Sequence, residues 1–418
     1  MTDQSFASTP SLRRAQAKMM VGAGIGMFLN PSPLVMLSFG VYLLPIVHDT
    51  GWDRDFIAGS IGAAMLLLGL TPPLVGWLIN RYGPHRISTI CFPLCGLAIM
   101  GLGLPTTPIM FVLALGLFGL LASGQTAVLY IYSLTGWFDR RRGMALGVGL
   151  ACTGLGVALI PPLAARGIDV LGWRQTYFAF GFAVFVIAIP VSRFLIIDPP
   201  VILGKTRDAV AGTAWRQALR SRVFWLLALA IFLVGSAAGG GMQNLNLMLI
   251  EKGVSPQNAS FILSLLGVSM IAARLICGAL FDRVRGQILT ALICAIVCTA
   301  FVTLAIRGDT VGIMIAAVLI GIGFGAEGDA LSYMASRAFG MRDFGTIFGV
   351  LFLAFTAGGG VGPMVFAVMR AQSGNYQAAM WVAAAACGVA TVLALMIRDA
   401  DLPYAAHRGR GSGEPRKA

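Results

Sequence analysis

The sequence predicts an all-α membrane protein with 12 transmembrane helices arranged in two pseudo-symmetric bundles of six. Of the 418 residues, 57% are hydrophobic and only 11% are charged, whereas a soluble domain carries about 25% charged residues to cover its surface in water. Many apolar runs are about 20 residues long or longer, the length that a helix needs to cross about 30 Å of hydrocarbon. Runs of this length with so little alternation also exclude a membrane β-barrel.

Charged residues and clusters of Gly and Pro divide the apolar sequence into twelve spans. Their expected limits are 19–47, 56–79, 87–104, 108–136, 143–165, 173–196, 223–250, 257–281, 287–306, 311–336, 345–369 and 376–397. A polar stretch from Asp198 to Arg222 separates the sixth and seventh spans, and the final residues, GRGSGEPRKA, are disordered by composition. The expected organisation is a cytoplasmic tail over 1–18, a bundle over 19–196, a cytoplasmic linker over 197–222, a bundle over 223–397 and a disordered cytoplasmic tail over 398–418.

Basic residues predict the orientation in the membrane. With the N-terminus placed in the cytoplasm, the cytoplasmic segments hold 23 of the 30 Lys and Arg residues, the opposite loops hold six, and Arg274 lies inside a span. Cytoplasmic loops carry such an excess of basic residues, so both termini are expected in the cytoplasm of a multi-pass inner-membrane protein. The same rule accounts for the net charge of +13 without a nucleic-acid partner.

The distribution of Cys and His residues argues against a metal or cofactor site. All seven Cys lie in apolar runs and the three His are far apart in loops or the tail, so no disulfide, metal or cofactor is expected. The sequence also shows no phosphate-binding loop and no additional soluble domain, so nothing in it supports a membrane enzyme or sensor. No cleavage-site pattern follows the basic residues near the N-terminus, so no removable signal peptide is expected.

The two halves of the sequence repeat at an offset of 202 residues. Gly76, Leu78, Arg81, Gly143, Gly147, Gly156, Pro161 and Gly172 fall on Gly278, Leu280, Arg283, Gly345, Gly349, Gly358, Pro363 and Gly374. A parallel repeat of six spans with a long middle loop is the layout of one large class of transporters.

Two loops carry a recognisable pattern. GWLINRYGPHR (76–86) and GALFDRVRG (278–286) resemble the G-x-L-x-D-R-x-G-R signature of the major facilitator superfamily, with Asn80 in place of the acid in the first copy. Segment 137–156 resembles the start of the fifth span of monocarboxylate transporters and oxalate–formate antiporters, although the tryptophan-rich acidic motif common before span 1 is absent. The resemblance implies a secondary transporter with a cytoplasmic latch that forms in one state and breaks in the other. The candidate latch residues are Gly76, Arg81, Gly278, Asp282 and Arg283.

Three ionisable residues lie inside predicted spans, namely Arg274, Glu327 and Asp329. A charge in the membrane costs about 3 kcal/mol or more, so each is a functional candidate. The sequence around Arg274 resembles that of the span-8 arginine that binds the substrate carboxylate in monocarboxylate carriers, and a guanidinium fork matches both carboxylate oxygens. The alternative is a permanent salt bridge between Arg274 and one of the two acids.

Glu327 and Asp329 are two residues apart, which separates them by about 200° on a helix. Both can face one cavity only if the flanking glycines loosen the turn. A buried carboxyl group near a guanidinium can take up and release a proton as access alternates, so one of the pair is predicted to couple transport to protons. Hydrogen bonds between packed helices are the alternative role.

Uncharged polar residues complete the predicted site. Spans 1, 4, 7 and 10 line the pore in the superfamily, and the candidate substrate contacts on them are Tyr42, Gln125, Tyr130, Asn244 and Tyr333. For each of them, hydrogen bonding between helices is the commoner role. The oxalate-exchanging carriers have a second cation in span 11, where this sequence has Phe355, and a single cation suits a monocarboxylate.

These features predict secondary active transport of a small organic monocarboxylate, aliphatic or aromatic, by proton symport and alternating access. A proton-driven exporter of amphipathic compounds and an anion exchanger are the alternatives. The expected partners are the organic anion, protons and the lipid bilayer, and the protein is expected to be a monomer.

Overall fold

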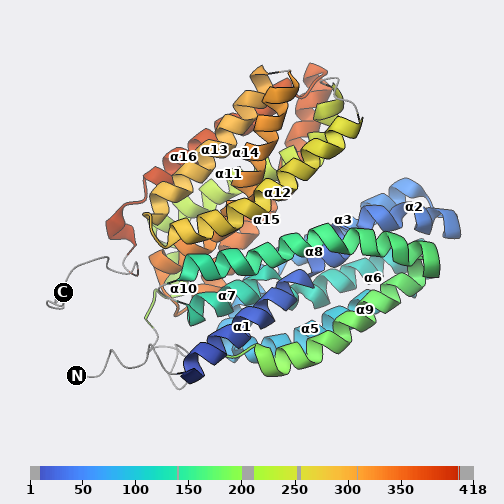
Figure 1. Ribbon diagram of the computed structural model, residues 1–418, viewed down its shortest axis with the longest axis horizontal. Helices are drawn as coiled ribbons and strands as arrows, with labels where there is room; N and C mark the ends of the chain where they lie inside the picture. The colour runs from blue at the N-terminus through green and yellow to red at the C-terminus, as the bar shows by residue number, and fades with distance from the viewer. Residues whose placement is uncertain are drawn as a thin grey trace.

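A computed structural model provides the structure of the protein and describes residues 10–138, 141–199, 211–251, 256–307, 309–402 and 404. In these ranges the chain is helical, apart from short connections and one isolated β-bridge. Helices α1 to α9 form one bundle and α11 to α16 form a second (Figure 1). The bundles meet where the short helix α10 (Trp215–Ala218) lies, which we call the closed end, and diverge toward the opposite, open end (Figure 1).

In the first bundle, four of the six spans are divided into segments. The elements are α1 (Pro10–Phe28), η2 (Ser32–Met36), α2 (Phe39–Thr50), α3 (Arg54–Leu70), α4 (Pro72–Tyr82), α5 (Pro84–Gly101), α6 (Pro108–Leu121), η3 (Ala122–Gln125), α7 (Ala127–Trp137), α8 (Arg142–Leu171), α9 (Trp173–Pro190) and η4 (Val191–Leu195). The first span breaks at Asn30, whose Nδ2 donates to the Met27 carbonyl (2.7 Å) and to Thr153 Oγ1 (3.2 Å). The Asn30 side chain thus satisfies polar groups that the break exposes.

In the second bundle, each span is one continuous helix. The elements are α11 (Arg222–Glu251), α12 (Pro256–Phe281), α13 (Gly286–Ile306), α14 (Thr310–Phe339), α15 (Phe344–Ser373) and α16 (Gln377–Leu395), followed by η6 (Asp399–Asp401). Every predicted span corresponds to one of these helices or to one group of segments in the first bundle, which confirms the twelve-helix fold. Some helices extend beyond the predicted limits, as α1 does by starting at Pro10, because long polar side chains at a helix end can reach water.

Length and hydropathy alone identify fewer spans. In the described ranges, nine helices are long and apolar enough to cross a membrane by themselves, and α3 with α4, bent by 42°, makes a tenth. The remaining two spans are α5, which begins with polar residues, and α12, which contains Arg274. The described apolar part of α12, Leu265–Phe281, is too short to cross a membrane by itself, and it carries the one arginine predicted to lie inside a span.

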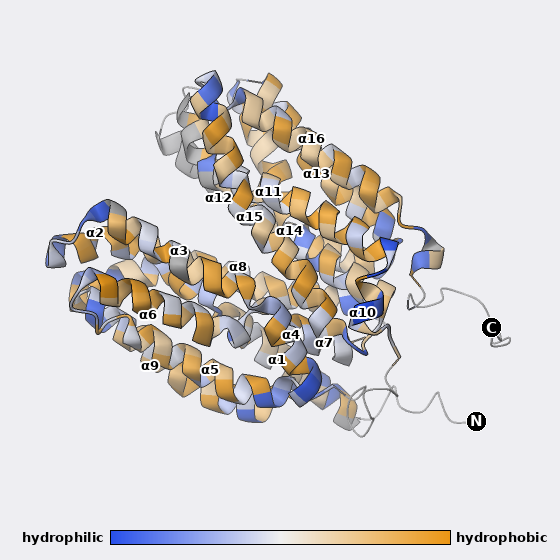
Figure 2. Ribbon diagram, turned by 180° about the vertical axis from the view of Figure 1, so that it is seen from behind, coloured by the Kyte–Doolittle hydropathy of each residue, from blue (hydrophilic) through white to orange (hydrophobic). Residues whose placement is uncertain are grey.

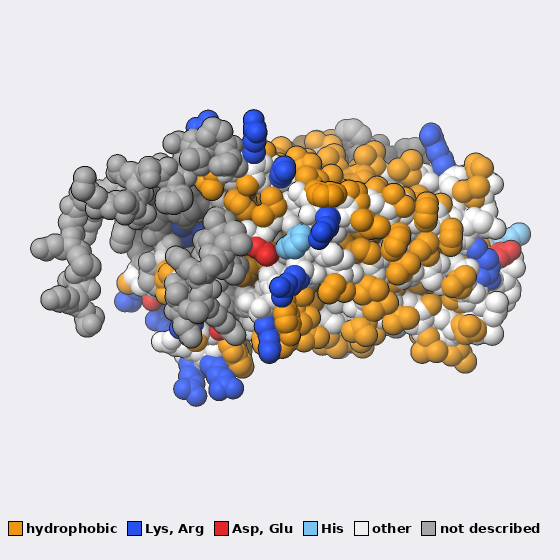
Figure 3. Space-filling view, turned by 90° about the horizontal axis from the view of Figure 1, so that it is seen from below, with side chains coloured by type: hydrophobic (Ala, Val, Ile, Leu, Met, Phe, Trp, Pro, Cys, Tyr) orange, Lys and Arg blue, Asp and Glu red, His pale blue; other side chains and the backbone are white. Residues whose placement is uncertain are grey.

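The outer surface has the character of a membrane protein. Hydrophobic residues cover the outer faces of both bundles and hydrophilic residues gather toward the ends (Figure 2). On the face shown in Figure 3, a broad hydrophobic area lies between a border of Lys and Arg side chains and a second charged border. Large apolar side chains such as Leu104 (72% exposed) and Val170 (80% exposed) are accessible, which is favourable in lipid and costly in water.

Two pairs of helices join the bundles at the closed end. Helix α4 packs against α15 and α8 packs against α12. At both contacts the backbones approach closely through glycines, with Gly76 on Gly345 and Gly143 on Gly278. A Cβ atom at any of these positions would collide with backbone atoms of the other bundle, so the closed end requires glycine there.

Candidate functional site

Arg274 lies on the inner side of α12, between the two bundles. One turn before Arg274, Ile271 packs against Gly154 of α8. The neighbouring Met270 packs against Gly325 of α14. Because successive helical residues are about 100° apart, the Arg274 side chain points between α8 and α14.

The Arg274 guanidinium connects the two bundles and is incompletely bonded. Its Nη1 donates to the Leu150 carbonyl of α8 at 3.2 Å. Its Nε is buried without a hydrogen-bond partner, although the side chain as a whole is only half-buried. A buried donor without a partner costs about 1–3 kcal/mol, so an acceptor entering from the space between the bundles would be bound favourably.

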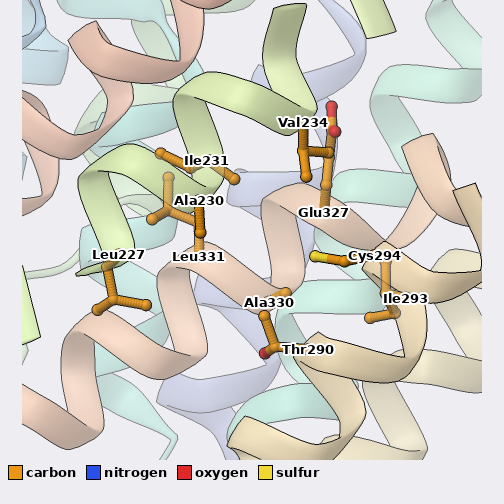
Figure 4. Close-up of a pocket in the computed structure, with 10 residues that line it drawn as sticks. All are labelled: Leu227, Ala230, Ile231, Val234, Thr290, Ile293, Cys294, Glu327, Ala330 and Leu331. Atoms are coloured by element: carbon orange, nitrogen blue, oxygen red, sulfur yellow. The ribbon is translucent and has the colours of Figure 1, made fainter. Parts of the chain in front are cut away.

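The two buried acids of α14 face different neighbours. Glu327, 8% exposed, lines a cavity of about 30 Å³ between α11, α13 and α14, together with apolar residues and Thr290 (Figure 4). This cavity has room for water. Asp329, 1% exposed, does not line it and is close enough to Arg274 and Cys277 of α12 to interact electrostatically.

Neither acid forms an ion pair with Arg274 in this conformation. Glu327 Oε2 and both carboxyl oxygens of Asp329 are buried without hydrogen-bond partners. Glu327 is also within electrostatic range of Arg274. The three groups therefore lie near one another without the permanent salt bridge that would make them purely structural.

Three of the candidate substrate contacts lie inside the first bundle. The rings of Tyr42 and Tyr177 are stacked at 3.9 Å. Tyr130 lies against Gly26 of α1, and Gln125 Nε2 donates to the Gly26 carbonyl at 3.3 Å. The hydroxyls of Tyr42 and Tyr130 and the Gln125 Oε1 atom are buried without partners.

The other two candidates lie near opposite ends of the second bundle. Asn244 Oδ1 accepts a hydrogen bond from the Tyr376 hydroxyl at 3.1 Å, beside a cavity of about 360 Å³ that Arg370 also lines. Tyr333 packs on Phe281 near the closed end, with ring centroids 5.0 Å apart. Among the contacts of the described residues, none joins the five neutral candidates to Arg274, so this conformation does not gather them into one site.

The two signature loops form equivalent contacts across the closed end. Asp282 accepts hydrogen bonds from the backbone N–H groups of Gly143 (2.9 Å) and Met144 (3.0 Å) in the first turn of α8. Asn80 accepts from the Gly345 N–H (3.2 Å) and donates to Thr346 Oγ1 (3.0 Å) in the first turn of α15. Each side chain thus caps a helix of the other bundle, where the backbone N–H groups have no partner within the helix.

The basic residues of the predicted latch take no part in these contacts. Arg81 lies over the rings of Trp77 and Tyr82 in its own helix, at 5.3 and 5.5 Å. Arg283 is exposed, and no hydrogen bond or ion pair joins its side chain to the described part of the chain. In this conformation Asp282, Asn80 and the glycines of the two signature loops contact the other bundle.

Sequence reasoning missed two further connections at the closed end. Arg142 is buried, and its Nη1 donates to Ser336 Oγ of the other bundle at 3.0 Å. The linker pairs with the loop after α14, where the Thr213 N–H donates to the Phe339 carbonyl (2.8 Å) and the Trp215 N–H to Asp343 Oδ2 (2.9 Å). The only signal in the sequence was the basic cluster around Arg142, which has an equally good explanation as an orientation signal.

Comparisons with known proteins agree with this architecture. The family model described as Major Facilitator Superfamily matches residues 19–363. The MFS-type transporter YcxA of Bacillus subtilis (strain 168) is 25% identical over 59% of this chain, a match that spans 60% of the relative's own length. Monocarboxylate transporter 13 of Rattus norvegicus is 24% identical over 84% of this chain and 82% of the relative. FucP, solved in the outward conformation, superposes with a TM-score of 0.70 at 16% identity over 92% of this chain and 99% of that one, which shows the shared fold.

Proposed function

This chain belongs to the major facilitator superfamily, and on that premise we propose that it carries a small organic monocarboxylate across the membrane together with a proton. The protein is a multi-pass membrane transporter and not an enzyme. One observation supports the proposed substrate and proton coupling. The Arg274 side chain lies half-buried between the bundles, and its buried Nε has no hydrogen-bond partner.

The substrate carboxylate binds to Arg274 in this proposal. The incoming oxygens pair with the free donor and replace the Leu150 carbonyl, which now accepts at 3.2 Å. A carboxylate is the better acceptor because it is charged and can bind two donors of the guanidinium at once. Binding therefore also releases a bond between α8 and α12 and connects substrate occupancy to movement of the bundles.

The coupling proton is carried by Asp329, with Glu327 as the alternative acid. The position of Asp329 supports this choice, because its buried carboxyl group is near Arg274 and has no hydrogen-bond partner. Glu327 faces the small cavity inside the second bundle. A proton on Asp329 removes its attraction to Arg274 and leaves the guanidinium available for the substrate.

Alternating access then consists of opening the closed end and closing the open end, as the bundles over 19–196 and 223–397 rock about the Arg274 site. The closed end faces the cytoplasm in this proposal, with both termini on that side of the inner membrane, and the transporter acts as a monomer. The cytoplasmic latch is the pair of caps made by Asp282 and Asn80, together with the bond between Arg142 and Ser336.

Counterflow and uptake in liposomes test the proposal. Purified protein is reconstituted, and a panel of monocarboxylates and dicarboxylates is measured with and without an inward proton gradient. Proton-driven accumulation of a monocarboxylate in the wild type and its loss in Arg274→Ala are the expected results. Arg193→Gln is the matched control, because that arginine is exposed in η4 and belongs to neither the predicted site nor the predicted latch.

Three results would contradict the proposal. Normal uptake by Arg274→Ala would exclude the carboxylate site. Transport that requires internal substrate and ignores the proton gradient would establish an anion exchanger. Proton-driven efflux of amphipathic compounds without carboxylate uptake would establish the exporter.

A further inference from the structure

Four phenylalanine rings form a continuous row along α15, which we call the phenylalanine ladder. The ring centroids are 5.5 Å apart from Phe344 to Phe348, 6.0 Å from Phe348 to Phe352 and 5.8 Å from Phe352 to Phe355. Phe344 also contacts Tyr132 of the other bundle at 6.1 Å. Phe344 and Phe348 are buried, whereas Phe352 and Phe355 are half-buried. The ladder therefore starts in the closed interface and ends where its last two rings are accessible.

Neighbouring contacts show the direction of the ladder. One side of the Phe355 ring packs against Gly235 of α11. On α15, Gly358 packs on α11 and Gly349 packs on α4. The membrane side of the helix is marked by the exposed Met364 and Val368. At about 100° per residue, Phe352 falls between the α11 side and the α4 side, away from the membrane.

The internal repeat places Phe352 and Arg274 at about the same distance from the closed end, measured along the helices. The offset of 202 residues places Phe352 on Leu150, and the Leu150 carbonyl is the present partner of Arg274. Distances along the helices agree, because Arg274 is eight residues from Asp282 and Phe352 is seven from Gly345, which is about 12 and 10 Å from the two caps.

One position of α14 between the guanidinium and the half-buried rings carries no side chain. Helix α14 contacts both α12 and α15 and so lies between them. It has glycine at position 328, where the nearest atom to an added Cβ would be Leu150 Cδ1 at 3.9 Å. A ligand bound to Arg274 can therefore extend along α14 toward the ladder.

We infer that the substrate is an aromatic monocarboxylate, with its carboxylate on Arg274 and its ring against Phe352 and Phe355. This inference rests on the proposed function, because it uses the Arg274 carboxylate site. Aromatic rings pair favourably at centroid separations of 4.5–7 Å, the spacing that the ladder itself shows. A ligand that touches both groups must cover much of the width of a helix, about 10 Å, so acids of two or three carbons are too short and an arylalkanoic acid is long enough.

A matched pair of substrates tests this inference. Propanoate and 3-phenylpropanoate share the carboxylate and the alkyl chain and differ only in the ring. The wild-type protein in liposomes is expected to transport 3-phenylpropanoate with a KM about tenfold lower than that of propanoate. Phe352→Leu and Phe355→Leu should each raise the KM for 3-phenylpropanoate about 2- to 10-fold and leave propanoate unchanged.

Phe366→Leu is the control, because it makes the same substitution on the same helix, and Phe366 packs on Phe301 away from the ladder. Size-exclusion chromatography shows whether each variant is folded, and the comparison of the two acids in the wild type needs no variant. Transport of propanoate as efficient as that of 3-phenylpropanoate would overturn the inference and leave the proposed function intact. So would equal losses for both acids in the ladder variants. Failure to transport any monocarboxylate would overturn both proposals.

Discussion

The two interfaces between the bundles have the same geometry and different chemistry. In one, α8 meets α12 through Asp282 and Arg274, and in the other, α4 meets α15 through Asn80 and the phenylalanine ladder. The repeat offset places Asn80 on Asp282 and Pro72 on Arg274. Both interfaces therefore contain close glycine contacts and a side chain that caps a helix of the other bundle. Charged residues are concentrated in the interface between α8 and α12.

This difference explains how Asn80 can replace an acid. A helix start offers backbone N–H groups without partners, and either a carboxylate or an amide oxygen can accept from them. Asp282 binds two such groups, whereas Asn80 binds one and adds a bond to the Thr346 hydroxyl. The amide keeps the cap and loses the attraction between a negative charge and the positive end of the helix.

We expect the largest effect on transport from substitution of Arg274, in the charged interface between α8 and α12. Arg274→Ala should lower carboxylate uptake at least about 30-fold, because truncating one partner of a desolvated charge pair costs about 2–5 kcal/mol. Arg274→Lys should recover only part of the loss, since an ammonium lacks the planar fork. Uptake rates in liposomes, normalised to the amount of folded protein, measure both. Similar uptake by the Ala and Lys variants would show that charge at this position is irrelevant.

The second effect separates the two acids. Asp329→Asn should abolish the response of uptake to a proton gradient while leaving counterflow measurable, because the amide cannot exchange a proton. Glu327→Gln should retain most of the gradient response, since Glu327 faces the small cavity between α11, α13 and α14. Uptake at two external pH values with a fixed internal pH compares them. A larger loss in Glu327→Gln would transfer the coupling role to that residue.

The third prediction concerns the cap that Asp282 makes on helix α8. Asp282→Ala removes two hydrogen bonds to the start of α8 and should shift the equilibrium away from the present conformation by about 0.5–2 kcal/mol per cap, a change of about 2- to 30-fold in the ratio of states. Electron–electron distance measurements between spin labels on the two bundles at the open end report this ratio. An unchanged distance distribution would mean that Asp282 does not stabilise the closed end.

We expect the smallest effect from a substitution that gives both interfaces an acidic cap. Asn80→Asp introduces a carboxylate at the start of α15 and should stabilise the present conformation by about 0.3–1 kcal/mol, partly offset by loss of the bond to Thr346. The same spin-label pair detects the change, with Arg193→Gln as a control outside both caps. A shift toward the opposite conformation would show that the hydroxyl contact outweighs the charge.

The sequence was most informative about features that depend on local composition. Apolar length and the positions of the charged residues predicted twelve spans, because a membrane requires each helix to satisfy its own backbone. Arg274, Glu327 and Asp329 were identifiable because charge is rare in such spans. Helix periodicity also predicted that the two acids need different neighbours.

Sequence alone determined that this chain is a two-bundle helical transporter with few buried charges, because those properties follow from hydropathy, periodicity and the internal repeat. Only the tertiary structure decided which groups meet. It placed Glu327 in a cavity inside one bundle, Asp329 toward Arg274 and Tyr42 against Tyr177. Contacts between residues more than a hundred positions apart depend on how helices cross and rotate, and small residues such as Gly143 and Gly278 set those crossings through backbone approach. No local pattern encodes that geometry.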